Sequence, residues 1–365
     1  MKWQIILSGL RARPVRTGVT ILAVSLQVAL ILVIVGLTTG TANEIGKRVA
    51  GVGADIMFQP AGADVLLAAN SATLKVSYGA QIAEKENVAA VAPVLVKIST
   101  NPLVNISGIE PASFDAVSGG FTYISGKIFS APDEIVIDDI FAKDHNLSVG
   151  DRIDLLQHSL KVTGIVENGK LTRVFMGLSA LQEINSTPDT TSLFFIKLKD
   201  ASDIDGSIKK LKESYPGYEL RNVPEYTKLM NGTAIPGFDA FNAVVVFVAL
   251  CIGILVIFLS MYTTIMERTR EIGILRSLGA SKFFIVTLIM KESILLCMIG
   301  VVLGTVGSFL IMNGARSFFP TLAFLISYKW IINAALSALV SGVVGSLHPS
   351  LKAASQDPIE AFAYE

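Results

Sequence analysis

Residues 267–281 read ERTREIGILRSLGAS and lie between two long apolar segments of the chain. The stretch carries five charged side chains in its first ten residues, whereas only 16% of the whole chain is charged. A connector between two membrane spans needs only a few polar turn residues. A long, charged connector with helical periodicity therefore indicates a separate structural element between the two spans.

The sequence around this connector is strongly apolar. Of its 365 residues 52% are hydrophobic, and the mean hydropathy is +0.59, which exceeds the apolar content of about 45–50% in soluble domains. The apolar residues collect in four blocks, and the remainder has the composition of a soluble domain. Because about 20 apolar residues cross a bilayer, we predict four spans at residues 17–37, 243–262, 283–312 and 330–347.

The first block also has features of a secretory signal peptide. Four basic residues precede it, and the sequence GTA at residues 40–42 could pass as a cleavage site. However, its apolar run is longer than the roughly 7–15 residues of a signal peptide. We therefore interpret the block as an uncleaved transmembrane helix.

The distribution of basic residues predicts the orientation of the spans, because loops rich in Lys and Arg stay in the cytoplasm. Four such residues precede the first span, four lie between the second and third spans, and two lie between the third and fourth. We expect a multi-pass protein of the cell (inner, cytoplasmic) membrane with both termini in the cytoplasm. The basic residues counted are Lys2, Arg11, Arg13 and Arg16, then Arg268, Arg270, Arg276 and Lys282, then Arg316 and Lys329.

Residues 40–240 would then form an outward-facing domain. They carry a net charge of −6 and the rest of the chain +6, and neither excess is large enough to suggest nucleic-acid binding. Alternating and β-branched runs predict strands at 52–58, 134–138 and 193–198, a turn into a strand at 148–154, and an amphipathic helix at 203–215. The fold class is a membrane protein: a bundle of four transmembrane helices with an α+β extracytoplasmic domain inserted between helices 1 and 2.

These patterns divide the chain into three parts. Residues 1–40 hold the N-terminal segment and the first span, residues 41–238 hold the extracytoplasmic domain, and residues 239–365 hold the remaining spans and a cytoplasmic tail. Small residues at four-residue spacing let membrane helices approach closely. On this basis we expect helix-packing roles for Gly300, Gly304, Ser337, Ser341 and Gly345.

No catalytic or metal-binding motif is legible in the sequence. The phosphate-binding pattern GxxxxGK[ST], HExxH and CxxC are all absent, and the two cysteines lie inside apolar blocks. The acidic residues Asp133, Glu134, Asp138 and Asp139 are interpreted as a solvated surface rather than a cation site. We therefore predict no catalytic residue, no metal and no cofactor.

The predicted spans contain little ionisable chemistry. Only Lys291 and Glu292 are ionisable within them, and mutual pairing or snorkelling near the cytoplasmic end explains both. Ion-coupled transporters place relay charges inside the membrane. A proton-driven pump is therefore disfavoured, and so is a channel, because no span has a polar face.

Placed on a helix, the connector is amphipathic and has a clear end. Its apolar residues cover about half of the circumference, Gly279 is a helix stop, and Ser281 is an N-cap for the third span. The (i, i+3) pairs Glu267–Arg270 and Arg268–Glu271 would support its first turn. Such a helix could dock into a groove of a partner protein or lie on anionic lipid. The apolar residues are Ile272, Ile274, Leu275 and Leu278, with Arg276 and Ser277 opposite.

Residues 267–280 resemble the coupling segment of the MacB/FtsX-type permeases of ABC transporters. The chain end, HPSLKAASQDPIEAFAYE at 348–365, resembles the PxxxAxxxxPxEALRYE ending of the same family, although His348 replaces a common tyrosine and Phe362–Ala363 replace Leu-Arg. Glu292 matches a glutamate often found early in the family's third span. Residues 133–154 and 162–166 are similar to its MacB-like periplasmic core domain.

This resemblance implies a non-catalytic permease subunit that works as a homodimer or heterodimer in the lipid membrane. ATP would be bound and hydrolysed by a separate ABC ATPase subunit. A coupling helix at about 267–280 would bind that subunit, and a membrane-fusion protein or another extracytoplasmic protein could be a further partner. The ATPase-binding residues implied are Glu267, Arg268, Arg270, Glu271, Leu275, Arg276 and Gly279.

Two functions remain open at this point. In the first, the chain is the permease of an ATP-driven exporter that works by mechanotransmission and expels (efflux) an amphipathic substrate. In the second, it is an FtsX-like signalling scaffold that activates an extracytoplasmic partner and transports nothing. The outward region is larger than in the FtsX type, which favours export.

Overall fold

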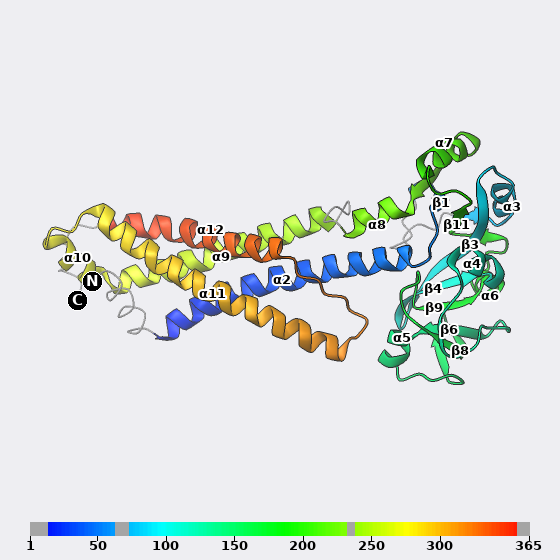
Figure 1. The fold of residues 1–365 in the computed structure, drawn as a ribbon. Helices are drawn as coiled ribbons and strands as arrows, with labels where there is room; N and C mark the ends of the chain where they lie inside the picture. Colours follow the sequence, from blue (N-terminus) through cyan, green and yellow to red (C-terminus); the bar gives the residue numbers. More distant parts are fainter. Residues whose placement is uncertain (1–13, 63–72, 232–237, 356–365) are drawn as a thin grey trace. The chain divides into compact units, whose positions relative to one another are not determined.

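The computed structural model describes residues 14–62, 73–231 and 238–355. The chain forms two compact units (Figure 1). The helical bundle comprises Met1–Gly40, Pro236–Phe318 and Phe324–Glu365. The inserted domain comprises Thr41–Ile235 together with Phe319–Ala323. The basic residues Lys2, Arg11 and Arg13 and the chain end at 356–365 lie outside the described residues.

Within the described ranges, four helices are long and apolar enough to cross a membrane, as predicted. Each is longer than the apolar block that predicted it, and α11 runs without a break through Lys291 and Glu292. A short helix, α10 (Thr269–Ser277), lies between the second and third of them. The four long helices are α2 (Pro14–Ala50), α9 (Phe238–Glu267), α11 (Lys282–Phe318) and α12 (Tyr328–Ser355).

Small residues lie where the bundle helices cross. A Cβ atom added at Gly304 of α11 would lie 2.5 Å from the carbonyl oxygen of Ser25 in α2, and one at Gly345 of α12 would lie 2.7 Å from that of Ile254 in α9. A Cβ atom at Gly300 would lie 2.6 Å from the side chain of Val24 in α2, and Ser337 and Ser341 are buried. Small residues at these crossings allow the helices to approach closely. Close packing matters here because lipid offers no hydrophobic driving force for helix association.

Polar side chains also join the bundle helices along their length. The Thr20 and Ser260 hydroxyls are 2.5 Å apart, and the Thr38 hydroxyl donates to Asn242 Oδ1 at 3.0 Å, both between α2 and α9. Between these contacts, the buried Gln27 Nε2 of α2 donates to Ser341 Oγ of α12 at 3.2 Å. Such bonds fix the register of helices whose outer surfaces are apolar.

The inserted domain is built on a mixed sheet. In the part of the chain that the structure describes, ten strands follow the order β12-β1-β11-β3-β4-β9-β6-β8-β5, with β7 paired to β8. The pairs β4/β9 and β6/β8 are parallel and the others antiparallel. The strands are β1 (Ile56–Pro60), β3 (Val88–Thr100), β4 (Leu103–Ile109), β5 (Tyr123–Gly126), β6 (Glu134–Asp138), β7 (Arg152–Leu155), β8 (His158–Val166), β9 (Val174–Gly177), β11 (Leu193–Leu198) and β12 (Tyr218–Asn222).

Short helices and one small ladder complete the domain. Strands β2 (Leu74–Lys75) and β10 (Thr190–Thr191) pair with each other. One apolar core surrounds Ile137 and Phe141, and a second surrounds Phe58 and Phe194. The helices are α3 (Ser77–Ala83), α4 (Pro111–Ser118), α5 (Asp139–Asp144), α6 (Leu178–Ile184), α7 (Ile204–Ser214) and α8 (Val223–Asn231).

The predicted elements of this domain are present, with one boundary shifted. The strands expected at 134–138 and 193–198 are β6 and β11, and the helix expected at 203–215 is α7, whose N-cap Asp203 accepts from the Gly206 amide at 2.8 Å. The strand expected from residue 52 begins at Ile56, because residues 51–53 turn sharply with Gly53 at φ +75°.

The prediction of a solvated acidic surface was wrong for Asp138. Its side chain is only 1% exposed and pairs with two arginines. Asp133 is exposed and pairs with Arg152, and Asp139 accepts from the Asn168 amide. Among the described residues, no group of three His, Cys, Asp or Glu side chains could hold a metal ion.

The helix crossings provide a matched pair of substitutions. Gly304→Ala should lower the free energy of unfolding by about 1–3 kcal/mol, because its methyl group would overlap the backbone of α2. Gly307→Ala should leave stability equal or slightly higher, because nothing lies within 4 Å of its Cβ position. Equal unfolding midpoints for the two variants in lipid bicelles would contradict this packing.

Candidate functional site

The chain leaves α9 and enters α10 through a polar corner. The backbone at Arg268 departs from helical geometry, with φ −105° and ψ 12°. The Thr269 hydroxyl lies within hydrogen-bond distance of the Ile265 and Met266 carbonyl oxygens, at 3.1 and 3.0 Å. Carbonyls at a helix end have no partner inside the helix, so this side chain stabilises the end of α9.

A pair of backbone hydrogen bonds ends α10. The amide of Ala280 donates to the Leu275 carbonyl and that of Gly279 donates to the Arg276 carbonyl, both at 3.0 Å. Gly279 has φ +93°, a conformation that glycine adopts without steric cost. This is the Schellman arrangement, and it agrees with the stop expected at Gly279.

The next helix begins directly after this turn. The amide of Phe284 donates to Ser281 Oγ at 3.2 Å, so Ser281 caps α11 as predicted. The element α10 is therefore a nine-residue helix, bounded by a polar corner and a glycine turn. It is shorter than the expected 267–280, because α9 continues to Glu267.

A buried ion pair anchors the start of α10 to α11. Arg268 Nη1 donates to Glu292 Oε2 at 3.0 Å, and the two side chains are 16% and 5% exposed. Of the two explanations that the sequence suggested for Lys291 and Glu292, mutual pairing was wrong, because Glu292 pairs with Arg268. Lys291 is exposed, as snorkelling requires. Position 291 lies about 100° from 292 around the helix, so the two side chains point in different directions.

The other end of α10 is anchored to α12. Arg276 Nη1 donates to the Ala354 carbonyl oxygen at 2.5 Å. Ala354 lies in the last turn of α12, where carbonyls lack helical partners and a cation is favourable. Arg276 was expected on the face opposite the apolar residues, yet it points into the bundle.

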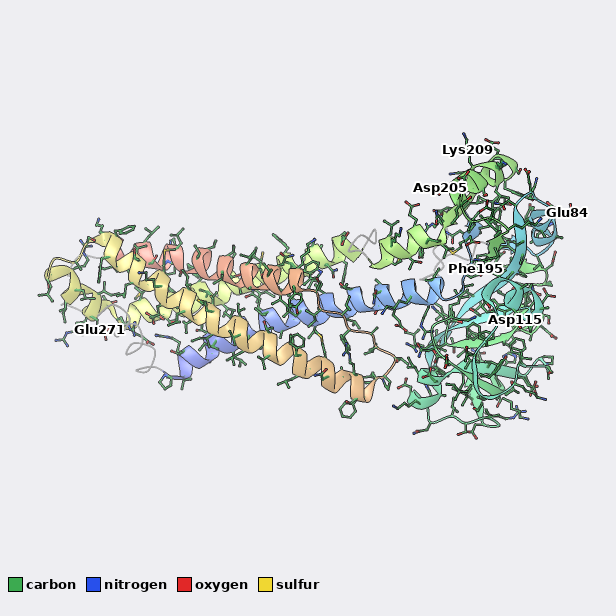
Figure 2. The ribbon with its side chains drawn as sticks, viewed as in Figure 1. Glu84, Asp115, Phe195, Asp205, Lys209 and Glu271 are labelled. Atoms are coloured by element: carbon green, nitrogen blue, oxygen red, sulfur yellow. The ribbon has the colours of Figure 1, made fainter. Side chains whose placement is uncertain are left out.

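Glu267 pairs across the bundle rather than along its own helix. Arg16 Nη1 of α2 donates to Glu267 Oε2 at 2.9 Å, in place of the expected Glu267–Arg270 pair. The expected Arg268–Glu271 pair is present at 3.8 Å. Glu271 is exposed (Figure 2), so this second contact is weak.

The outward side of α10 combines apolar and charged residues. Ile272 and Gly273 are buried, whereas Ile274 and Leu278 of the same expected apolar face are exposed, Leu278 to 79%. We define the α10 face as the exposed large or charged residues Arg270, Glu271, Ile274 and Leu278, together with Phe283 at the start of α11.

Sequence reasoning assigned only part of this face. Arg270 and Glu271 were predicted to bind a partner, whereas Ile274, Leu278 and Phe283 were not. Large apolar side chains within and just after a charged connector are the sequence signal for such residues, and the structure shows that these three are exposed. Arg268 and Arg276, also predicted to bind a partner, make contacts inside the bundle, Leu275 is half-buried, and Gly279 shapes the turn. The arrangement is an exposed surface on a short helix that is anchored at both ends.

Comparison with known protein families gives matches over most of the chain. Residues 17–214 match the MacB-like periplasmic core domain family. Residues 243–358 match the FtsX-like permease C-terminal family. The first match covers more than half of the chain, and the second includes α10 and both of its anchors.

Individual relatives are similar along the full sequence. The uncharacterized ABC transporter permease YknZ of Bacillus subtilis is 23% identical over 98% of each chain. The macrolide export ATP-binding/permease protein MacB of Mannheimia succiniciproducens is 23% identical, and the present chain spans only 61% of its length. The crystal structure of the periplasmic region of MacB from Actinobacillus actinomycetemcomitans covers 52% of the chain and 98% of that structure, with a TM-score of 0.39 and 15% identity.

The anchors of α10 are testable without any partner. Arg268→Met should lower the free energy of unfolding by about 3–5 kcal/mol, because it leaves the carboxylate of Glu292 buried and unpaired. Arg270→Met, two residues away and exposed, should change it by less than about 0.5 kcal/mol. Unfolding titrations in bicelles measure both, and the double variant Arg268→Met/Glu292→Met should recover most of the loss. Equal stability of the two single variants would contradict the buried pair.

Proposed function

The chain belongs to the MacB/FtsX-type family of ABC transporter permeases, and from this membership we propose that it is the permease subunit of an ATP-driven exporter. An ABC ATPase subunit binds the α10 face and hydrolyses ATP. The resulting displacement of α10 moves the bundle helices and, through them, the inserted domain. The exported substrate is an amphipathic molecule.

The observation that carries this proposal is the anchored, exposed α10 face. Its outer residues combine large apolar side chains with both signs of charge, which suits docking into a groove of a partner protein. Its inner residues bind α11 through Glu292 and α12 through Ala354. A force applied to the α10 face is therefore transmitted to α11 and α12. A connector without these anchors would bend instead.

The proposed orientation places α10 and both termini in the cytoplasm, where ATP is available. The basic residues on and beside α10 support this, because such residues are retained on the cytoplasmic side. The inserted domain then faces outward. This arrangement also favours partner docking over the alternative of an interfacial helix, since Ile272 and Gly273 are already buried in the bundle.

The proposed assembly contains two permeases and two ATPase subunits. ABC ATPases close on nucleotide as a pair, so each requires its own docking face. The similarity of the chain to YknZ over 98% of both lengths supports an ATPase carried by a separate subunit. The printed function of MacB, macrolide export, supports export as the activity class.

The docking role is tested by a matched pair of exposed leucines. Leu278→Glu should reduce co-purification of the ATPase subunit with the full chain at least about tenfold, as expected for an apolar anchor worth about 2 kcal/mol. Leu103→Glu, in the inserted domain and 80% exposed, should leave it unchanged. Quantitative affinity capture from membranes of the source organism measures both, with thermal melts to verify folding.

Retention of the ATPase by the Leu278→Glu variant at wild-type levels would contradict the proposal. Export is tested separately from docking. Cells lacking the chain should accumulate amphipathic dyes and drugs that the wild type expels. Normal efflux together with loss of an extracytoplasmic activity would instead support the signalling scaffold.

A further inference from the structure

Four charged side chains form an ionic cluster in the inserted domain, which we define as the buried Arg48 and Asp138 with the partly buried Glu44 and Arg173. Asp138 is its centre: one carboxylate oxygen accepts from Arg48 Nη2 at 2.7 Å and from Arg173 Nη1 at 3.2 Å. Its other oxygen accepts from the Phe141 amide at 2.7 Å and caps α5. The side chain of Arg48 is 5% exposed, so this pairing takes place away from solvent.

Arg48 connects the cluster to the end of α2. This helix begins in the bundle, and its last residues, from Thr41, belong to the inserted domain. Arg48 Nε donates to Glu44 at 2.9 Å, and the Arg48 carbonyl accepts from the Leu171 amide at 2.8 Å. Side chain and backbone together therefore fix the last turn of α2 to the domain.

Arg173 connects the same carboxylate to a second segment. Its Nη2 donates to the Thr321 carbonyl at 3.3 Å. Thr321 lies in Phe319–Ala323, the short stretch between α11 and α12 that groups with the inserted domain. Two residues after that stretch, the Leu325 amide donates to the Gly36 carbonyl of α2 at 2.9 Å. The cluster thus holds two segments that connect the inserted domain to the spans. One is the end of α2, and the other is the stretch 319–323 between α11 and α12.

The position of Asp138 in the sheet makes it a stiff point of attachment. It is the last residue of β6, which pairs with β8 on one side and β9 on the other. The amide of Asp138 donates to the Arg173 carbonyl at 2.8 Å, so the two residues are joined by backbone as well as side chain. A displacement applied here reaches the interior of the sheet rather than an edge.

Stability alone does not account for the cluster. The two carboxylates balance the two guanidinium groups in charge. Burial lowers the pKa of Arg173, and the neighbouring positive charge of Arg48 lowers it further, whereas Asp138 and Glu44 act in the opposite direction. Apolar residues of similar volume often stabilise a core equally well, and in some proteins buried ionic groups serve to specify one geometry. In this cluster, the geometry concerned is the attachment of the end of α2 and of residues 319–323 to the last residue of β6.

We propose that Asp138 is a positioning residue that fastens the end of α2 and the connector 319–323 to the inserted domain. Movements of the bundle then reach the domain through two attachments at one carboxylate. This inference rests on the proposed function for its role in transport, but the fastening itself is measurable in the isolated chain.

The test uses amide hydrogen exchange of the full chain in lipid nanodiscs. Asp138→Asn keeps an oxygen that caps α5 but removes the charge, and should speed exchange of the Leu171 amide about tenfold or more. Asp203→Asn, at the exposed N-cap of α7, is the matched control and should leave that amide unchanged.

A second variant separates the two attachments. A lysine side chain offers one nitrogen where Arg173 uses two, so Arg173→Lys keeps the ion pair with Asp138 and loses the bond to Thr321. It should speed exchange of the Leu322 amide, which donates to the Phe319 carbonyl, and leave the Leu171 amide protected. Unchanged exchange at both amides in both variants would overturn the fastening.

The transport role is read in the complex with the ATPase subunit. Trapping with ATP and vanadate should change exchange in the inserted domain of the wild type and of Asp203→Asn. Asp138→Asn should lose this change while hydrolysing ATP within about twofold of the wild-type rate. An unaltered nucleotide response in Asp138→Asn would overturn the positioning role. If no ATPase subunit associates with the wild type, the proposed function fails, and the nucleotide-free exchange still decides the fastening.

Discussion

The position of α10 depends on one buried ion pair, that of Arg268 with Glu292. A carboxylate buried within a bundle of apolar helices must be paired, so it fixes where the chain turns out of α9. Arg276 fixes the other end of the short helix on α12. Both arginines make their contacts inside the bundle. The side of α10 that stays exposed, and that a partner could bind, is therefore the one that carries Ile274 and Leu278.

A similar device appears in the inserted domain. There a buried aspartate binds two arginines, one from the end of α2 and one that also holds the connector between α11 and α12. In both units a carboxylate and an arginine join a long helix to a neighbouring element. Such pairs add little stability compared with apolar packing, and in some proteins buried ionic groups serve to specify one geometry instead. Under the proposed function, that geometry would carry movement from the bundle helices to their neighbours.

Local signals in the sequence predicted the elements but not these pairings. The spans follow from apolar length, and the ends of α10 and α11 follow from Gly279 and Ser281, whose effects reach only a few residues. Mutual pairing with Lys291 was wrong for Glu292, and a solvated surface was wrong for Asp138. The arginine that pairs with Glu292 lies 24 positions away along the chain, and the two that pair with Asp138 lie 90 and 35 positions away. The inward orientation of Arg276 likewise depends on the C-terminal end of α12.

Site-specific cross-linking tests the central claim, that α10 is the surface on which the ATPase acts. A photoreactive amino acid at Ile274 should cross-link to the ATPase subunit in membranes. The same group at Val149, which is similarly exposed in the inserted domain, should not. The cross-link at Ile274 should also change in yield between nucleotide-free and ATP-bound states. Absence of any cross-link at Ile274, with ATPase co-purifying normally, would contradict the claim.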